Sequence, residues 1–371
     1  MSASSQPGTA PVVLLAAGGT GGHLFPAEAL AGALSARGIL VDLATDERAA
    51  RYAGHFPARH VHILPADTVR SRSPLALART ALSLGTGIAR GVGLMRRLRP
   101  AVVVGFGGYP TVPPILAGVI AGRPTLIHEA NAVLGRANAL LAPRVSAIAT
   151  GYPDILAARP ALAAKARHTG NPVRPAVLAV TGVPFAPVAD GTFHLLVFGG
   201  SQGASIMSEI VPPAVARLAP ALRARLSIVQ QCRQEDLARV EADYAGLGVR
   251  SELAPFFADL PARMAQAHFV VGRSGASTVA ELCAIGRPSL LVPLPHALDQ
   301  DQLANATALA DAGGALLVPQ STFTPERLAA ELERVAASPE PLAAMAAAAR
   351  RLGRPDAAER LADLVAELGG L

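Results

Sequence analysis

The sequence predicts an α/β protein with two Rossmann-like, doubly wound domains that face a cleft. The chain of 371 residues exceeds the length at which one hydrophobic core usually stops growing, so two domains of similar size are expected. Short apolar runs alternate with longer amphipathic or alanine-rich stretches, which is typical of βαβ units. The apolar runs are continuous rather than alternating, which indicates strands buried on both faces of parallel sheets.

The apolar runs give the expected strands in order, and helix-like residues 26–38 follow the first of them. The predicted strands are residues 11–17, 39–45, 101–106, 125–130, 147–151, 194–200, 226–231, 268–274 and 289–294. Residues 100–122 carry no charge and are long enough to cross a bilayer. Prolines and glycines interrupt them, so we interpret them as a buried strand, its turn and a short helix.

An internal echo sets the domain boundaries. The strand that ends in the glycine-rich residues 18–22 recurs as a strand that ends in residues 199–203, and each begins a new doubly wound unit. We expect an N-terminal domain at 11–168, a linker rich in Pro and Gly at 169–191, and a C-terminal domain at 192–354. A last helix at about 355–368 follows, and it could pack back on the first domain.

Composition narrows the class of protein. Hydrophobic residues make up 51% and charged residues 16%, which excludes a disordered chain. The two cysteines, Cys232 and Cys283, make no disulfide framework, which favours a reducing compartment. The first ten residues carry neither a basic nor an apolar signal-peptide region, so the protein is expected to remain where it is made.

The net charge of +6 favours an anionic partner. Nucleic acid is poorly supported, because only 4% of residues are aromatic and no Lys/Arg run is interleaved with stacking residues. Residues 70–99 place leucines among seven arginines, as expected of a segment that lies on an anionic membrane surface. An ordinary surface helix is an equally good interpretation, because apolar residues often pack beside arginine stems.

Two loops suit phosphate chemistry. Residues 18–23 (GGTGGH) lie between a buried strand and a helix, where glycines let backbone N–H groups approach an anion, although a tight turn alone explains them as well. The dinucleotide fingerprint fails because Leu24 stands where Gly or Ala is needed, and no Walker lysine follows.

The second loop begins a helix at Ser274, Gly275 and Ala276, whose small side chains leave the N–H groups open to a diphosphate. The Thr278 hydroxyl adds a donor, and Glu281 lies about one turn later, where its carboxylate suits a ribose diol. The alternative for Glu281 is a solvated helix charge, which its apolar neighbours disfavour.

Seven motifs together resemble those of the MurG family of peptidoglycan glycosyltransferases. They are AGGTGGH, GGYP, HEAN, GNPVR, GGSQGA, RSGASTVAE and the H-x5-Q-x2-N pattern of His296, Gln302 and Asn305, and they span about residues 12–315. The resemblance implies the GT-B glycosyltransferase fold, UDP-N-acetylglucosamine as donor, and lipid I, the undecaprenyl-diphosphate-linked muramyl pentapeptide, as acceptor. It also implies a peripheral protein on the cytoplasmic face of the inner membrane, in cell-wall synthesis that serves cell shape and division, with other cell-wall synthesis proteins as possible partners.

The resemblance assigns roles to residues motif by motif. Thr20, Gly21 and Gly22 contact the donor or the acceptor diphosphate, Asn131 and Gln302 hold the transferred sugar, Arg174 and Ser201 contact the nucleotide, Phe257 meets uracil through its backbone, and Ala276, Ser277, Thr278, Val279, Ala280 and Glu281 hold the diphosphate and ribose. The chain departs from the family pattern at Ser208, where Asn is often seen, at one residue added between His296 and Gln302, and at Asp301, where Gln is common.

Transfer from an α-linked UDP-sugar to a β-linked product inverts the anomeric carbon, so a single displacement by the acceptor's C4 hydroxyl is expected. His23 is the first choice of base because an ordinary histidine pKa of about 6.5 suits proton removal near neutral pH, while Glu129 and His128 are rivals. His128 is also typical of a packed strand histidine. The helix start at Ser274 and an arginine, Arg273 or Arg174, would stabilise the UDP leaving group.

No cofactor and no metal are expected, since the Asp299-Gln300-Asp301 run lacks a third metal ligand nearby. Three alternatives remain: a UDP-sugar 2-epimerase, a nucleotide-sugar or phospholipid-binding protein without catalysis, and, last, an NAD-dependent dehydrogenase. The division of reactive groups, with histidines and a glutamate in the first domain and nucleotide loops in the second, favours a transferase.

Overall fold

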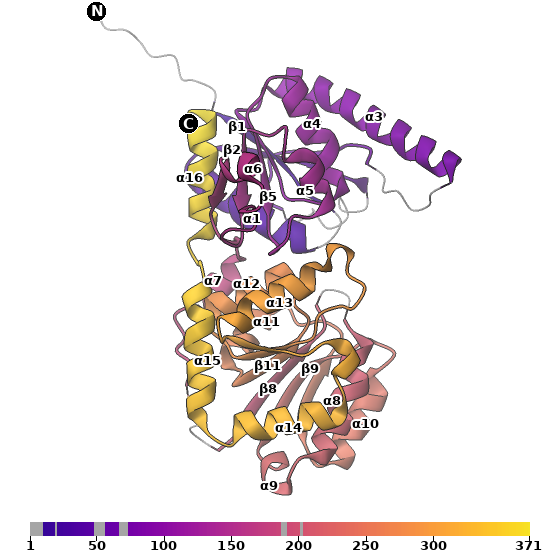
Figure 1. Ribbon diagram of the computed structural model, residues 1–371, viewed down its shortest axis with the longest axis vertical. Coiled ribbons are helices and arrows are strands. Elements are labelled where there is room, and N and C mark those ends of the chain that lie inside the picture. Colours follow the sequence, from indigo (N-terminus) through magenta and orange to yellow (C-terminus); the bar gives the residue numbers. More distant parts are fainter. Residues whose placement is uncertain (1–9, 19–20, 48–55, 67–72, 187–190, 201–202) are drawn as a thin grey trace, which may run out of the picture. The chain divides into compact units, whose positions relative to one another are not determined.

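The computed structural model describes residues 10–18, 21–47, 56–66, 73–186, 191–200 and 203–371. The chain divides into two compact units (Figure 1). Unit 1 comprises the chain up to Ala130, Leu134–Pro172 and Asp356–Leu371, and unit 2 comprises Asn131–Val133 and Val173–Pro355. The units therefore divide inside the stretch expected to be a linker.

Unit 1 is built on a parallel sheet in the order β3-β2-β1-β4-β5-β6-β7. Its strands are β1 (Val12–Ala16), β2 (Leu40–Thr45), β3 (Val61–Ile63), β4 (Val102–Gly105), β5 (Thr125–Glu129), β6 (Ala147–Thr150) and β7 (Ala166–His168). Each strand that the apolar runs predicted is present. The edge strands β3 and β7 were not predicted, because they are three residues long and lack an apolar run.

Helices cover both faces of this sheet. They are α1 (Gly21–Ala36), α3 (Pro74–Leu98), α4 (Val112–Ile120), α5 (Arg136–Leu141), α6 (Pro160–Ala163) and α16 (Ala357–Gly369), with the 3-10 turn η2 (Tyr109–Thr111) before α4. Helices α1 and α16 pack on one face, and Leu34 and Leu361 are fully buried there. Helices α3, α4 and α5 pack on the other face, around Ile115. The last helix thus returns to unit 1, and Arg37 of α1 holds it through Glu359 and Asp363.

Unit 2 repeats this plan with a six-stranded parallel sheet in the order β10-β9-β8-β11-β12-β13. Its strands are β8 (Phe193–Phe198), β9 (Leu226–Gln231), β10 (Arg250–Ala254), β11 (Phe269–Gly272), β12 (Ser289–Leu291) and β13 (Ala315–Leu317). Its helices are α7 (Pro175–Leu178), α8 (Ser205–Arg217), α9 (Pro220–Arg223), α10 (Leu237–Gly246), α11 (Leu260–Gln266), α12 (Ala276–Ile285), α13 (Asp301–Asp311), α14 (Pro325–Ala336) and α15 (Pro339–Leu352), with 3-10 turns η3 (Leu298–Gln300) and η4 (Gln320–Thr322). Helix α7 lies within the expected linker.

The strand orders place two pairs of loops side by side. In unit 1 the chain runs outward from β1 to β3 and returns to β4 beside β1, so the loops after β1 and β4 are neighbours. In unit 2 the same reversal places the loops after β8 and β11 together. Open α/β sheets bind ligands at these reversal points, at the carboxyl ends of the strands. The four loops contain the glycine-rich motifs and the RSGAS segment.

Residues 100–122 form β4, η2 and α4, as the interrupted apolar pattern predicted. Within the described ranges of the chain, no helix is both long and apolar enough to cross a membrane.

Candidate functional site

The turn from β1 into α1 requires glycine at its first position. A Cβ on Gly18 would lie 2.8 Å from the Pro110 Cβ and 3.4 Å from the Asp46 Oδ1, so no side chain fits there. Helix α1 begins at Gly21, which leaves the N–H groups of its first turn at the carboxyl edge of the sheet. Of the predicted contacts, Gly21 and Gly22 lie in this first turn, whereas Thr20 lies outside the described residues.

His23 packs against the glycine pair of the GGYP motif. A Cβ on Gly107 would lie 3.3 Å from the His23 Cε1, and one on Gly108 would lie 3.4 Å from its Nε2. Both glycines have positive φ angles, 88° and 73°. The ring is half-buried, and it occupies space that only a glycine pair leaves open. The sequence contained this motif, but the pattern gave no sign that it supports His23.

His128 differs sharply from His23 in its surroundings. Its side chain on β5 is fully buried, and Nε2 donates to the Gly170 carbonyl at 3.1 Å. Burial, with a smaller contribution from the charge of His23, lowers the pKa of His128 to about 4, although the Gly170 hydrogen bond opposes the shift. A neutral ring with no exposed atom favours the packed strand histidine over the catalytic base.

Glu129 is a buried carboxylate held in one position. It is 3% exposed, and its Oε2 accepts hydrogen bonds from the Gly135 N–H at 2.9 Å and from the Asn138 Nδ2 at 2.8 Å. Asn138 also donates to the His128 carbonyl at 3.1 Å, so it joins the first two residues of the HEAN motif, His128 and Glu129, to α5. The sequence did not single out Asn138, because an asparagine inside a helix carries no pattern that points to a carboxylate on a neighbouring strand.

Unit 2 contains an ion pair between two predicted nucleotide contacts. Arg174 Nη2 lies 2.8 Å and Nε 3.0 Å from Glu281 Oε1. Glu281 is 4% exposed, so it is not the solvated helix charge that was the alternative. Burial raises the pKa of Glu281, and the charge of Arg174 opposes that shift. The pair fixes the carboxylate on α12 about one turn after the helix start.

The start of α12 has the form that the sequence predicted. Gly275 is the N-cap and the helix begins at Ala276, directly after β11 and its short loop. Ser277, Thr278 and Ala280 are half-buried, while the Val279 side chain is buried in the core, so any ligand contact of Val279 would come from its backbone. This end of α12 presents unpaired N–H groups at the reversal point of the sheet.

Helix α13 is tied to this loop. Ser274 Oγ donates to the Gln302 carbonyl at 2.7 Å, and the Gln302 Oε1 accepts from the Leu294 N–H at 3.1 Å. Asn305 is fully buried, and its Nδ2 donates to the Ser274 carbonyl at 3.1 Å and to the Asn131 Oδ1 at 3.0 Å. Two predicted sugar contacts, Asn131 and Gln302, therefore belong to one hydrogen-bonded group in unit 2, with Asn305 at its centre.

The remaining predicted residues have more varied surroundings. Arg273 donates to the carbonyls of Val292 and Pro293 and to the Gln320 side chain at 2.6 Å, which favours a structural role over one at the leaving group. The Phe257 ring is 8% exposed and lies 4.3 Å from the Arg263 guanidinium. Ser201 lies outside the described residues. Across the described part of the chain, no three His, Cys, Asp or Glu side chains are grouped as metal ligands would be.

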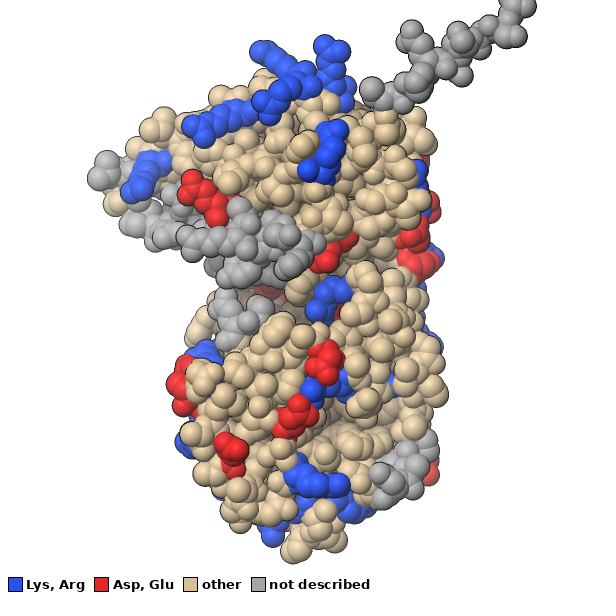
Figure 2. Space-filling model, turned by 180° about the vertical axis from the view of Figure 1, so that it is seen from behind, with Lys and Arg blue, Asp and Glu red and all other residues tan. Residues whose placement is uncertain are grey.

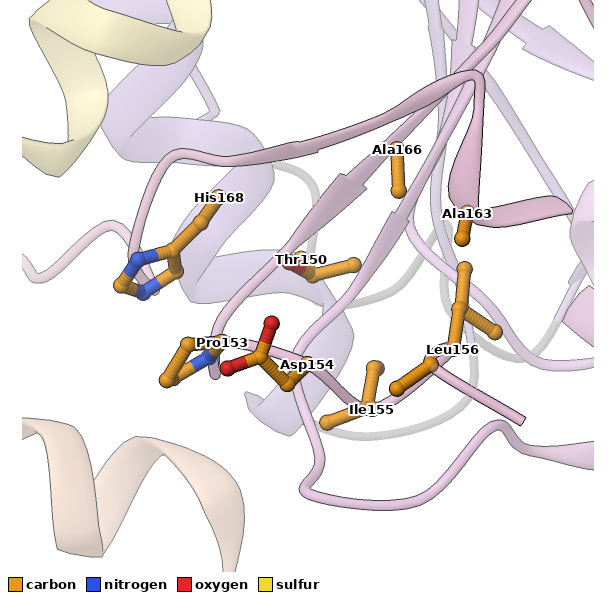
Figure 3. Close-up of a pocket in the computed structure, with 9 residues that line it drawn as sticks. Thr150, Pro153, Asp154, Ile155, Leu156, Ala163, Ala166 and His168 are labelled. Carbon is orange, nitrogen blue, oxygen red and sulfur yellow. The ribbon is translucent and has the colours of Figure 1, made fainter. Parts of the chain in front are cut away.

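Unit 1 also has a pocket of about 190 Å³ at the carboxyl ends of β6 and β7 (Figure 3). Thr150, Asp154 and His168 supply its polar groups, and Leu156 and neighbouring alanines form its apolar wall. The sequence analysis did not predict it, because its lining comes from a loop with no recognisable motif.

The chain belongs to glycosyltransferase family 28. Residues 13–150 match the N-terminal domain of this family and residues 194–361 match its C-terminal domain. With two parallel-sheet Rossmann-like units, the chain has the GT-B glycosyltransferase fold.

Close relatives carry one enzyme name. Proteins from Nitrobacter hamburgensis (60% identical, 98% of each chain covered) and a Bradyrhizobium species (61% identical, 98% of this chain and 99% of the relative) are both named UDP-N-acetylglucosamine–N-acetylmuramyl-(pentapeptide) pyrophosphoryl-undecaprenol N-acetylglucosamine transferase. Among solved structures, MurG of Acinetobacter baumannii is similar at a TM-score of 0.80 and 30% identity, over 96% of this chain and 99% of that one.

Proposed function

We propose that the chain transfers N-acetylglucosamine from UDP-N-acetylglucosamine to the C4 hydroxyl of the muramyl sugar of lipid I, with inversion, to give lipid II in peptidoglycan synthesis. The observation that carries this proposal is the identity of about 60% over 98% of the chain to relatives named for this transfer. The proposal is supported by the position of the described glycine-rich and RSGAS loops at the carboxyl edges of the two sheets, where ligands bind in open α/β folds.

His23 is the proposed base. It is half-buried at the reversal point of unit 1, whereas His128 is fully buried and Glu129 is 3% exposed with two donors on one oxygen. A base must reach the hydroxyl whose proton it removes, and accessibility favours His23. In this proposal the Glu129 carboxylate stabilises the positive charge that His23 acquires when it takes up a proton. Glu129 is also the rival candidate for the base.

On the donor side, the first turn of α12 and Glu281 are proposed to bind the diphosphate and the ribose. The N–H groups of the first helical turn oppose the negative charge that develops on the UDP leaving group. Arg174 holds the Glu281 carboxylate at 2.8 Å, which keeps it oriented toward a diol. The other residues of the motifs remain proposed ligand contacts. They are Asn131 and Gln302 for the sugar, Phe257 and Ser201 for the nucleotide, and Thr20, Gly21 and Gly22 for the donor or the acceptor diphosphate.

The transfer assay that tests these roles measures radiolabelled N-acetylglucosamine moved from UDP to a synthetic lipid I analogue. Wild type is compared with His23→Ala and Glu281→Ala. We expect turnover to be lost in His23→Ala, by about 10²-fold or more for a general base, and donor KM to rise in Glu281→Ala. Epimerisation of the donor, or release of UDP without transfer, would refute the assignment of lipid I as the acceptor. Loss of transfer on EDTA treatment, restored by Mg²⁺, would overturn the metal-independent mechanism.

We further propose that the protein acts as a peripheral protein at the cytoplasmic face of an anionic membrane. Helix α3 carries exposed Arg79, Arg90, Arg96 and Arg97, and Leu82 is 72% exposed between them. Figure 2 shows Lys and Arg side chains gathered on this part of unit 1. Cosedimentation with vesicles that contain phosphatidylglycerol, but not with phosphatidylcholine vesicles, is the expected result, and equal binding to both would overturn the electrostatic part. Contacts with other cell-wall synthesis proteins stay a proposal from the resemblance alone.

A further inference from the structure

Gln231 joins two loops at the carboxyl edge of the unit 2 sheet. It is the last residue of β9, which lies between β8 and β10. Its Oε1 accepts a hydrogen bond from the Gly199 N–H at 3.1 Å, and its Nε2 donates to the Pro255 carbonyl at 3.1 Å. The side chain is 7% exposed. Only the strand between two neighbours can place one side chain against both of their loops.

The first loop, after β8, turns back tightly at Gly199. A Cβ at this position would overlap the backbone nitrogen of Ala204, so the chain must reverse there without a side chain. Gly200 and Gly203 have φ angles of 86° and 69°, which other residues rarely adopt. The hydrogen bond from the Gly199 N–H to Gln231 holds the start of this turn against β9.

The second loop, after β10, is fixed at its far end by a different group. The Arg263 guanidinium lies over the Phe257 ring and bonds to Asp259 Oδ1 at 2.8 Å and to Glu252 Oε2 at 2.7 Å. At its near end, Pro255 has no N–H, and its carbonyl is the group that Gln231 holds. Gln231 and Arg263 therefore secure the two ends of this loop.

We propose that Gln231 is a positioning residue for the donor: its amide fixes the spacing between Gly199, at the end of β8 where phosphate-binding loops stand in this fold, and the loop after Pro255, which contains the proposed uracil contact Phe257. The inference rests on the proposed function, which assigns those two loops to the nucleotide. An amide is suited to the task because one end accepts and the other donates, and neither a carboxylate nor an apolar side chain can do both. Preorganised loops bind with a smaller ordering cost, so the gain appears as affinity for a ligand that spans both.

The test compares Gln231→Leu, Gln231→Glu and the control Gln266→Leu in the full chain. Gln231→Leu removes both hydrogen bonds, and Gln231→Glu keeps the acceptor for Gly199 but turns a carboxylate toward the Pro255 carbonyl. Gln266 is exposed at the end of α11, before β11 begins, so it lies at the opposite edge of the sheet. Calorimetry measures the Kd for UDP, and inhibition of transfer measures the Ki for uridine, which carries the base and the ribose but no phosphate and so cannot span both loops.

We expect the Kd for UDP to rise about tenfold in Gln231→Leu, which corresponds to about 1.4 kcal/mol, and about threefold in Gln231→Glu. The Ki for uridine should stay within about twofold of wild type, kcat at saturating donor should be unchanged, and Gln266→Leu should bind both ligands as wild type does. An equal loss for UDP and uridine would show general damage to the unit and overturn the spacing role, as would unchanged UDP binding in both Gln231 variants. Failure of wild type to bind UDP would instead refute the proposed function. If Gln231→Leu does not fold, Gln231→Glu alone decides.

Discussion

Replacing Gly107 with alanine tests whether the GGYP motif holds the proposed base in place. The φ angle of Gly107 is 88°, a conformation that costs an L-residue roughly 1–2 kcal/mol. The added Cβ would also lie 3.3 Å from the His23 Cε1 and 3.5 Å from the Asn138 Nδ2, so the ring must shift by a few tenths of an ångström or more. A small displacement of a catalytic group is costly, and a shift of about 1 Å is worth on the order of 10²-fold in rate.

Gly38 supplies a matched control for the strain alone. Its φ angle is 75°, but a Cβ there would meet no atom within 4 Å, and it lies between α1 and β2 at the other edge of the sheet. We expect Gly107→Ala and Gly38→Ala to lower the Tm by a similar amount, about 2–8 °C. Only Gly107→Ala should lose kcat in the lipid I transfer assay, by about 10- to 100-fold. Equal kcat in the two variants would refute the reasoning that this glycine pair positions His23.

Three other predictions concern buried polar groups. Asn138→Leu removes a donor to Glu129 and should lower kcat about tenfold while donor KM stays unchanged in steady-state kinetics; unchanged kcat would deny Glu129 a fixed role. His128 has a pKa of about 4 when folded and about 6.5 when unfolded, so the unfolded chain takes up the proton first as the pH falls. Stability is therefore fully present above about pH 6.5 and falls by on the order of 3 kcal/mol toward pH 4, a dependence that urea denaturation should find reduced in His128→Phe. Arg273→Met should lower the Tm and leave donor KM within about twofold, because the guanidinium serves backbone carbonyls and Gln320; a large rise in KM would return Arg273 to the leaving group.

The sequence predicted the sheets well because their central strands are buried on both faces and are therefore continuously apolar. Strands β3, β7 and β10 contain histidine or charged residues and gave no such run, whereas β13 is apolar but only three residues long and was missed. The repeat of glycine-rich loops could be recognised in the sequence because both loops occupy the same position in their sheets. Each loop follows a central strand at a reversal of strand order, where ligands bind in open α/β sheets and glycine lets backbone N–H groups approach them.

The site was less predictable where pairing depends on tertiary packing. The apolar neighbours of Glu281 correctly indicated burial, but its partner Arg174 lies far away in the sequence and no local pattern joins them. The hydrogen bonds of Gln231 to Gly199, of Asn138 to Glu129 and of Asn305 to Ser274 join different elements and leave no trace in residue spacing. Arg273 is the opposite case. Its position in the RSGAS motif predicted a contact with the leaving group, but its guanidinium donates to backbone carbonyl groups.

His23 and His128 differ in burial, and the proposed function gives them different roles. His23 is the proposed base, and His128 is a packed strand histidine. Burial disfavours a positive charge on His128 and lowers its pKa, and the charge of His23 adds to this shift. His128 has no exposed surface and stays neutral near neutral pH, so in the proposed mechanism a proton that His23 takes from the acceptor hydroxyl meets no second positive ring. Glu129 follows His128 on the same strand, and its carboxylate is held in place by Asn138 and Gly135. In the proposed mechanism, a neutral His128 therefore favours a transient imidazolium at His23, while the N–H groups at the start of α12 oppose the negative charge that develops on UDP.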